Sequence, residues 1–368
     1  MKAARRDDAA GRRIRSRRGG LALSSLLTAL ALALACGNPE SLGISALSVV
    51  SPGVVNDPSN KSLRFDLLEF GLSRFCVEML RRGAPIKLSD HEPVLGRFFA
   101  DGCQTQVIDQ ADRQSVVVRY SGKGYAWTNL TERLGFSSTG LIEYAADFQQ
   151  QGDDMYIYFR PRNVGSTSFQ TLLVESTLAQ VGISLSGTNV EALGGDIITR
   201  QLQRGFTVIR HEPRGDVEFS TGLVPLGQRP FRPYQVVNTD KLTLDNDRTE
   251  VHIGQQDYIG GMTVPDDGRL YLNLSLDGAN TVDVLLVPEV DGQALTGAYV
   301  TTRGAARLAR APLLDVALVR GQPAKLDLAL PAGNYYLIFD HSASMGLTPP
   351  AAGEHAAKVD YLVQVGER

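Results

Sequence analysis

Two hydrophobic periodicities divide the chain after its first 61 residues. Over Ser62–Arg82, apolar side chains recur every three or four positions, which predicts an amphipathic helix that ends at Gly83 before Pro85. A similar stripe predicts a second helix over Val190–Arg204. Elsewhere in this part, alternation with a period of two predicts strands at 115–120, 141–148, 154–160, 169–175, 206–210 and 217–220.

The C-terminal part has strand patterns only. Leu270, Leu272, Leu274 and Leu276 alternate with polar residues, and further strands are expected at 282–287, 325–330, 335–340 and 359–365. The proline-rich stretch 225–233 fits neither helix nor sheet interior and places a domain boundary near residue 236. We therefore predict an α+β domain over residues 62–235, an antiparallel sheet with two helices, followed by an all-β sandwich over 236–368.

An export signal is expected over residues 1–35. Its apolar run, Leu21–Ala35, spans 15 residues, fewer than the roughly 20 that cross a bilayer, and follows an arginine-rich start. The alanines before Cys36 also suit ordinary cleavage of a soluble secreted protein. Arg17-Arg18 leaves open whether export uses the general or the twin-arginine route.

The stretch that ends Ala33-Leu34-Ala35-Cys36 resembles the signal of bacterial lipoproteins. The resemblance implies cleavage before Cys36, a diacylglycerol thioether on its sulfur and an acyl group on its amine. Gly37, where an inner-membrane protein has Asp, implies transit to the outer membrane of a diderm bacterium. Residues 36–61, rich in Gly, Ser, Pro and Asn, are then a lipidated tether.

Charge argues against nucleic acid as a partner. The formal net charge is −3, but residues 1–35 hold eight Lys and Arg and two Asp, which leaves 29 basic and 38 acidic side chains after them, a net of −9. An acidic surface repels phosphate backbones. The expected partners are the membrane, through the lipid on Cys36, and an envelope protein or glycan.

The C-terminal part resembles the bacterial pre-peptidase C-terminal family. The similarity lies in the Gly333-Asn334-Tyr335-Tyr336 turn and in the last strand, 360–365, and covers residues 249–368. It implies an accessory β-sandwich without catalytic residues.

Cys76 and Cys103 are the two cysteines left once Cys36 is lipidated. In an oxidising compartment we expect them to form a disulfide. The alternative is a catalytic thiol, for which His91 is the histidine nearby in sequence.

The other reactive residue types do not form a known constellation. The five histidines lack zinc-ligand spacing, so neither a metal nor another cofactor is expected. Ser344 lies in a segment similar to a serine-hydrolase elbow, but Ser342 occupies the position where that turn needs glycine.

Three functions remain for the exported chain. The first is a non-catalytic envelope module that binds a partner or has a structural role. The second is a carrier or sensor of an apolar ligand, suggested by Tyr156 and Tyr158 on a strand whose two faces are both apolar or aromatic; the alternative is a strand between two packed layers. The third is a periplasmic hydrolase that uses Ser344 or Cys103.

Overall fold

The computed structural model describes residues 52–57, 59–66, 68, 76, 80, 82–110, 113–176, 200, 203–211, 216–236 and 240–367. Apart from α3 (Pro52–Val55), the helices and strands named here belong to one compact unit, Val55–Arg368. In chain order they are β1 (Ala84–Lys87), β2 (Val94–Gln110), β3 (Arg113–Thr128), β4 (Glu132–Gln151), β5 (Asp154–Val174), β6 (Phe206–His211), β7 (Asp216–Thr221), β8 (Leu242–Val251), β9 (Gln255–Val264), β10 (Gly268–Asp277), β11 (Thr281–Pro288), α7 (Glu289–Thr301), β12 (Leu314–Val319), β13 (Ala324–Ala329), β14 (Gly333–His341) and β15 (Ala357–Glu367).

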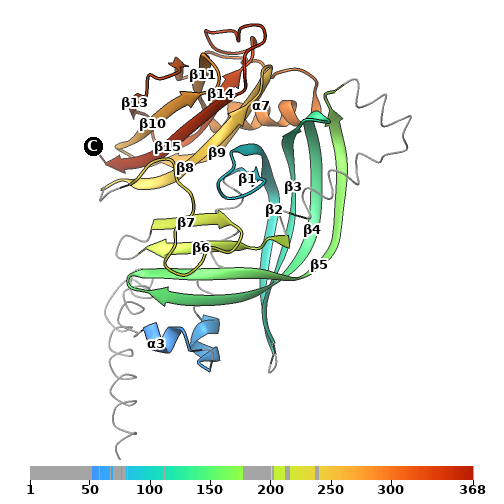
Figure 1. The fold of residues 1–368 in the computed structure, drawn as a ribbon, viewed down its shortest axis with the longest axis vertical. Coiled ribbons are helices and arrows are strands. Elements are labelled where there is room, and N and C mark those ends of the chain that lie inside the picture. Colours follow the sequence, from blue (N-terminus) through green and yellow to red (C-terminus); the bar gives the residue numbers. More distant parts are fainter. Residues whose placement is uncertain are drawn as a thin grey trace, which may run out of the picture. The chain divides into compact units, whose positions relative to one another are not determined.

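Four long strands form the body of the N-terminal part. Strands β2 to β5 contain 17, 16, 20 and 21 residues and pair as a continuous antiparallel meander, which β6 and β7 extend and β1 joins along β2. Figure 1 shows these strands side by side and bent along their length. On one face, alternate side chains pack into a core that includes Val116, Val118, Tyr144 and Phe159.

The expected α+β class of this N-terminal part is wrong, because strands dominate it. The predicted strands 154–160 and 169–175 are one strand, β5. Register shifts at Ala100/Gly102, Thr139/Leu141 and Glu143/Tyr144 explain the short predictions, because each bulge reverses which positions face the core. A period-two pattern broken in this way resembles several short strands.

The two predicted helices are only partly described. Of Ser62–Arg82, the described residues 62–66, 68, 76 and 80 are helical, and Leu68 packs into the core against β3 and β4. Val190–Arg204 lies outside the described residues except for Arg200 and Gln203, which are helical, and Arg204. Among the described residues, no helix is long and apolar enough to cross a membrane.

The C-terminal part is the β-sandwich that the alternation predicts. One layer is β13-β10-β15-β8, which continues into the meander where β8 pairs with β2 through Val94 and Thr249. The other layer is the four-stranded sheet β12-β11-β14-β9. Leu270, Leu272, Leu274 and Leu276 are at most 5% exposed and lie in the core that the two layers share. The proline-rich stretch 225–233 has no regular structure, and the boundary near 236 stays a prediction.

Helix α7 leaves β11 and packs on the meander. Its docking requires glycine in β4, because a Cβ at Gly135 would stand 1.9 Å from the backbone oxygen of Val300. Leu295, Tyr299 and Val300 of the helix also share a buried cluster with Tyr336 of β14. The helix thus contacts both the meander and the sandwich.

Candidate functional site

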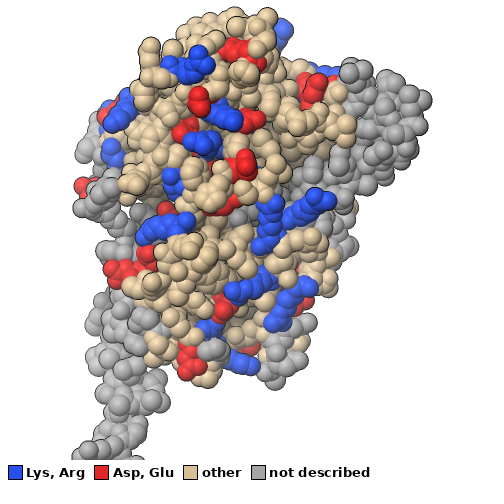
Figure 2. Space-filling view, in the orientation of Figure 1, with Lys and Arg blue, Asp and Glu red and all other residues tan. Residues whose placement is uncertain are grey.

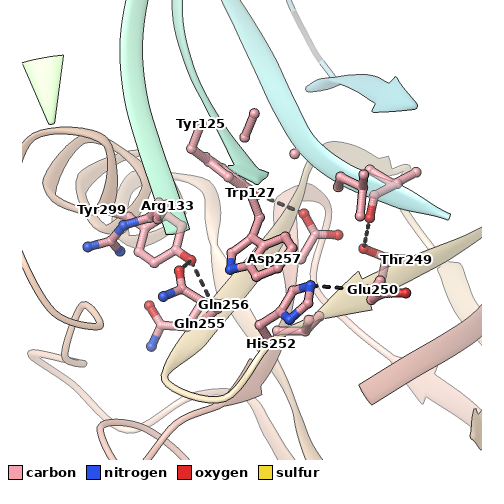
Figure 3. A pocket seen from close by; sticks show the side chains of 15 residues that line it. Tyr125, Trp127, Arg133, Thr249, Glu250, His252, Gln255, Gln256, Asp257 and Tyr299 are labelled. Carbon is pink, nitrogen blue, oxygen red and sulfur yellow. Dashed lines mark hydrogen bonds and ion pairs between the residues drawn. The ribbon is translucent and has the colours of Figure 1, made fainter. Parts of the chain in front are cut away.

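A small hollow lies where the meander meets the sandwich, and side chains from six elements line it (Figure 3). Its volume is about 20 Å³, room for about one water molecule. The side chains at issue are Tyr125 and Trp127 from β3, Arg133 from β4, Thr249 and Glu250 from β8, His252 after it, Gln255, Gln256 and Asp257 from β9, and Tyr299 from α7.

The carboxylate of Asp257 is the centre of the buried part of this site. Arg97 Nε lies 3.0 Å from Asp257 Oδ1, and Arg97 Nη2 lies 3.0 Å from Asp257 Oδ2. Tyr125 donates its hydroxyl proton to the same carboxylate over 2.7 Å. Tyr361 extends the network: its hydroxyl accepts from Arg97 and donates to Asp245. Each of the donors on Asp257 is therefore fixed by a strand of the large sheet.

Burial sets the protonation states in this network. Burial is the largest single influence and lowers the pKa of Arg97, but the charge and hydrogen bonds of Asp257, with Tyr361 and Asp245, together raise that pKa well above its ordinary value. Burial, and after it the charge of Asp257, raises the pKa of Tyr125 well above its ordinary value. The guanidinium is thus permanently charged and the phenol stays a hydrogen-bond donor.

A second set of polar contacts holds α7 to the start of β9. The Tyr299 hydroxyl donates to Gln255 Oε1 at 2.7 Å and accepts from the Gln256 backbone N–H at 2.9 Å. Arg133 lies over the Tyr299 ring, with its guanidinium carbon 3.9 Å from the ring centroid. Its Nη2 also pairs with Glu175 at 3.0 Å. These buried groups mainly bind one another.

Aromatic and acidic side chains line the more exposed part of the site. The Trp127 indole, the single tryptophan of the chain, stacks on the His252 imidazole with ring centroids 3.3 Å apart and planes 9° apart. His252 Nε2 lies 3.0 Å from Glu250 Oε1, and the two side chains are 22% and 17% exposed. The hydrogen bond with His252 lowers the pKa of Glu250 against the opposing effect of burial. The carboxylate is therefore ionised at neutral pH.

A further ion pair joins β1 to β8. Lys87 and Asp247, whose side chains are 4% and 8% exposed, lie 2.7 Å apart. Burial raises the pKa of Asp247, and Lys87 opposes that increase. Together with Arg97 and Asp257, this pair ties the N-terminal strands to the strands after residue 236.

The two cysteines that were predicted to form a disulfide do form one. Cys76 and Cys103 form a disulfide with an S–S distance of 2.02 Å, which confirms the expected pairing. Cys103 consequently has no thiol to act as a nucleophile. Cys36, the predicted lipidation site, lies outside the described residues.

Among the described residues, Ser344 has no histidine hydrogen-bonded to it that could accept its hydroxyl proton and so activate it. Its backbone N–H donates to Ser342 Oγ, which in turn donates to Asp340. The neighbouring His341 side chain is 1% exposed and its Nδ1 lies 3.1 Å from the Val251 carbonyl oxygen. In the described part of the chain, no hydrogen bond joins Ser344 to a histidine.

Tyr156 and Tyr158, the predicted apolar-ligand residues, are packed against protein. They are 1% and 4% exposed and cluster with Ile209 and Val224. The Tyr156 hydroxyl donates to the Gln228 carbonyl at 3.1 Å, so the stretch after β7 covers the tyrosines. Ile157, on the opposite face of β5, packs against the meander core, and the strand lies between two layers.

The residues of the hollow were not predicted from the sequence. Trp127 could have been noticed in the sequence, since it is the single tryptophan and lies at the end of a strand pattern. Arg97 and Asp257 offer none, because they lie 160 positions apart and neither belongs to a motif. In the described residues, no group of three or more His, Cys, Asp or Glu is arranged to hold a metal ion.

Comparisons with known proteins add little. No protein-family model matches the chain, and neither does any curated protein. One solved structure with some similarity is a glycoside hydrolase family 43 arabinoxylan arabinofuranohydrolase from Bacillus subtilis in complex with cellotetraose, at 8% identity over 73% of this chain and 80% of that chain, with a TM-score of 0.21. A TM-score this low gives no basis for assigning a fold or an activity.

Proposed function

We propose that this protein is a lipid-anchored, non-catalytic binding module of the cell envelope, held by acyl chains on Cys36 at the outer membrane of a diderm bacterium. The observation that carries the proposal is the 15-residue apolar run that ends in Ala33-Leu34-Ala35-Cys36. Each buried methylene of an acyl chain contributes about 0.8 kcal/mol, so several chains give a stable anchor.

The Cys76–Cys103 disulfide supports export. Disulfides persist in the periplasm and on cell surfaces and are rare in the reducing cytosol. The bond joins the segment around Cys76 to β2, the first long strand of the meander. A chain with this bond and this N-terminus fits an oxidising envelope compartment.

The outward face of the meander is the surface that we assign to the partner. Cross-strand neighbours there are polar: Arg119 lies opposite Gln104, and Ser137 lies between Lys123 and Gln170. Gln104, Arg119, Lys123 and Gln170 are all exposed. Side chains of both charge signs are interspersed over the visible face of the molecule, as Figure 2 shows. A mixed polar face of this kind offers charges and hydrogen-bonding groups to a partner whose surface is complementary.

The anchor is tested by Cys36→Ser in a bacterial host fed an alkyne-labelled fatty acid. We expect the wild-type protein to carry label and to sediment with outer membranes, and the variant to lose both. Cys103→Ser is the matched control, since it also removes one cysteine and keeps the label. Label retained on Cys36→Ser would refute the anchor.

The binding face is tested by photo-crosslinking in cells. A benzoylphenylalanine at Arg119 should give one discrete adduct, whereas the same group at Lys325, exposed on β13 of the sandwich, should not. Identical adducts at both positions, or none at Arg119, would refute the assignment of this face.

A further inference from the structure

A second hollow lies between α7 and the segment that follows it. Its volume is about 140 Å³, and most of its lining residues are apolar. The lining residues are Val287 of β11, Asp291, Ala294, Leu295 and Ala298 on one face of α7, and residues 306–311 of the segment 302–313, which we call the arginine strap. In Figure 1, α7 lies beside the sandwich strands near the ends of β3 and β4.

The arginine strap is fixed at both of its ends. At the first end, Ala306 exchanges two hydrogen bonds with the buried Gln256 side chain, and Arg133 donates to the carbonyl oxygens of Thr302 and Gly304. At the other end, the Leu313 backbone N–H donates to the Leu286 carbonyl at 2.8 Å. Residues 306–311 between these points line the hollow together with α7, so the hollow is preformed and a ligand that enters it does not have to order the chain.

Two arginine side chains at the rim of the hollow give it positive charge. Arg307 and Arg310 line it and are exposed, and neither makes an ion pair or hydrogen bond with any described residue. Residues 300–314 contain a third arginine, Arg303, and no acidic residue. Guanidinium groups bind carboxylates in a forked, charge-assisted geometry.

Asp291 limits the ligand's charge. It lines the same hollow from the first turn of α7, where its carboxylate repels a second negative charge. The hollow therefore favours one carboxylate over two. Its volume is close to that of engineered cavities, about 150 Å³, that accept a benzene-sized group.

We propose that this hollow binds a monocarboxylate with a compact apolar group of about five or six carbons, the apolar group resting on Ala294, Leu295 and Ala298 and the carboxylate held by Arg307 and Arg310. This chemistry occurs in small branched or aromatic acids and at the C-terminal leucine or phenylalanine of a peptide. The site is separate from the outward face of the meander and does not depend on the function proposed above.

The test is a titration of the full chain in detergent micelles with 4-methylpentanoate and, separately, with an N-acetylated tetrapeptide that ends in a free leucine. Saturation-transfer NMR reports contact, and calorimetry gives Kd. We expect at least one acid to bind and its amide, which has the same shape without the charge, to bind at least tenfold more weakly. Binding of the acid alone or of the peptide alone identifies the source.

Variants assign the binding to the hollow. Arg307→Gln with Arg310→Gln should weaken it at least tenfold, whereas Arg303→Gln, on the same strap but outside the lining, should leave Kd within twofold. Ala298→Leu should abolish binding by filling the hollow, and circular dichroism checks that it folds. We expect a millimolar Kd for these acids. Three results would each overturn the proposal: no binding of either acid at 10-fold excess over that Kd, equal binding of the amide, or unchanged binding by the double arginine variant.

Discussion

Arg97 and Asp257 form a buried ion pair between the two sheets of the molecule. Arg97 belongs to β2 of the large sheet and Asp257 to β9 of the smaller sheet, and their side chains are 1% and 5% exposed. They also lie on opposite sides of residue 236 in the chain. The pair therefore makes the stability of the meander and of the sandwich depend on each other.

Removal of Arg97 should strongly destabilise the whole protein. Arg97→Met leaves the Asp257 carboxylate buried without its cation, and breaking a buried pair in this way costs about 3–5 kcal/mol. Urea unfolding followed by Trp127 fluorescence measures the loss. Because both parts depend on the pair, we expect one transition, shifted to lower urea, in the variant.

Two controls separate the missing charge from the missing contact. Arg269→Met breaks a partly exposed pair with Asp327, 26% and 53% exposed, and should lower the stability far less than Arg97→Met does. Arg97→Met combined with Asp257→Leu removes both charges and should recover most of the stability. A double variant as unstable as Arg97→Met would show that packing, not the unpaired charge, is responsible.

Glycine 135 should be indispensable for the docking of α7. A Cβ there would stand 1.9 Å from Val300 O and 2.9 Å from Val300 C, so Gly135→Ala forces the helix away from β4. We expect a loss of about 1–3 kcal/mol, the usual cost of overpacking. Circular dichroism melts measure it.

The matched control lies in α7 itself. Gly297 is helical and a Cβ there would meet nothing within 4 Å, so Gly297→Ala should stabilise the protein by about 0.5–1 kcal/mol. A Gly135→Ala variant that melts like the wild type would contradict the close approach of helix and strand.

The sandwich was predictable because its alternation is regular. The leucines of β10 keep a strict period of two over the whole strand, and all four are buried. Helix α7 was not predictable, although its buried positions, Gly292, Leu295, Thr296, Tyr299 and Val300, do follow helical spacing. Two of these five are glycine and threonine, so the buried stripe is not hydrophobic and the pattern of apolar residues misses it.

The hollow between the two parts could not be predicted for a different reason. Trp127, His252 and Asp257 contribute to the site only through partners on other strands. The pairing of β2 with β8 brings these three residues together across more than 100 positions of the sequence. A single sequence gives no information on such distant pairs. The disulfide was predictable only because the predicted lipidation of Cys36 would leave two cysteines.

The Cys76–Cys103 disulfide should contribute substantially to stability. It closes a segment with a sequence separation of 27, for which the chain-entropy model gives about 3–4 kcal/mol. Cys76→Ser with Cys103→Ser should lower the free energy of unfolding by that amount, as should dithiothreitol on the wild type. Dithiothreitol should have no effect on the double variant, and a further loss there would show that the reductant acts elsewhere.

Stability should fall between pH 4 and pH 6 because of Asp340. Burial, opposed by hydrogen bonds from Ser342, Gln256 and the Met345 backbone, raises the pKa of Asp340 from 3.8 to about 6. The folded state then binds this proton more tightly than the unfolded state, so the contribution is full below pH 4 and is lost as the pH rises through 6. The size of the loss is roughly 3 kcal/mol. Asp340→Asn, whose Oδ1 still accepts hydrogen bonds, should remove this fall of the unfolding free energy with pH, as urea unfolding at pH 4, 5, 6 and 7 measures it.

Other groups, Glu250 among them, titrate with the opposite sign, so the difference in unfolding free energy between wild type and variant at each pH is the quantity to compare. Asp327→Asn, on an exposed strand of the sandwich, should keep the slope of the wild type. If Asp340→Asn also keeps it, the pH dependence originates in another buried carboxylate.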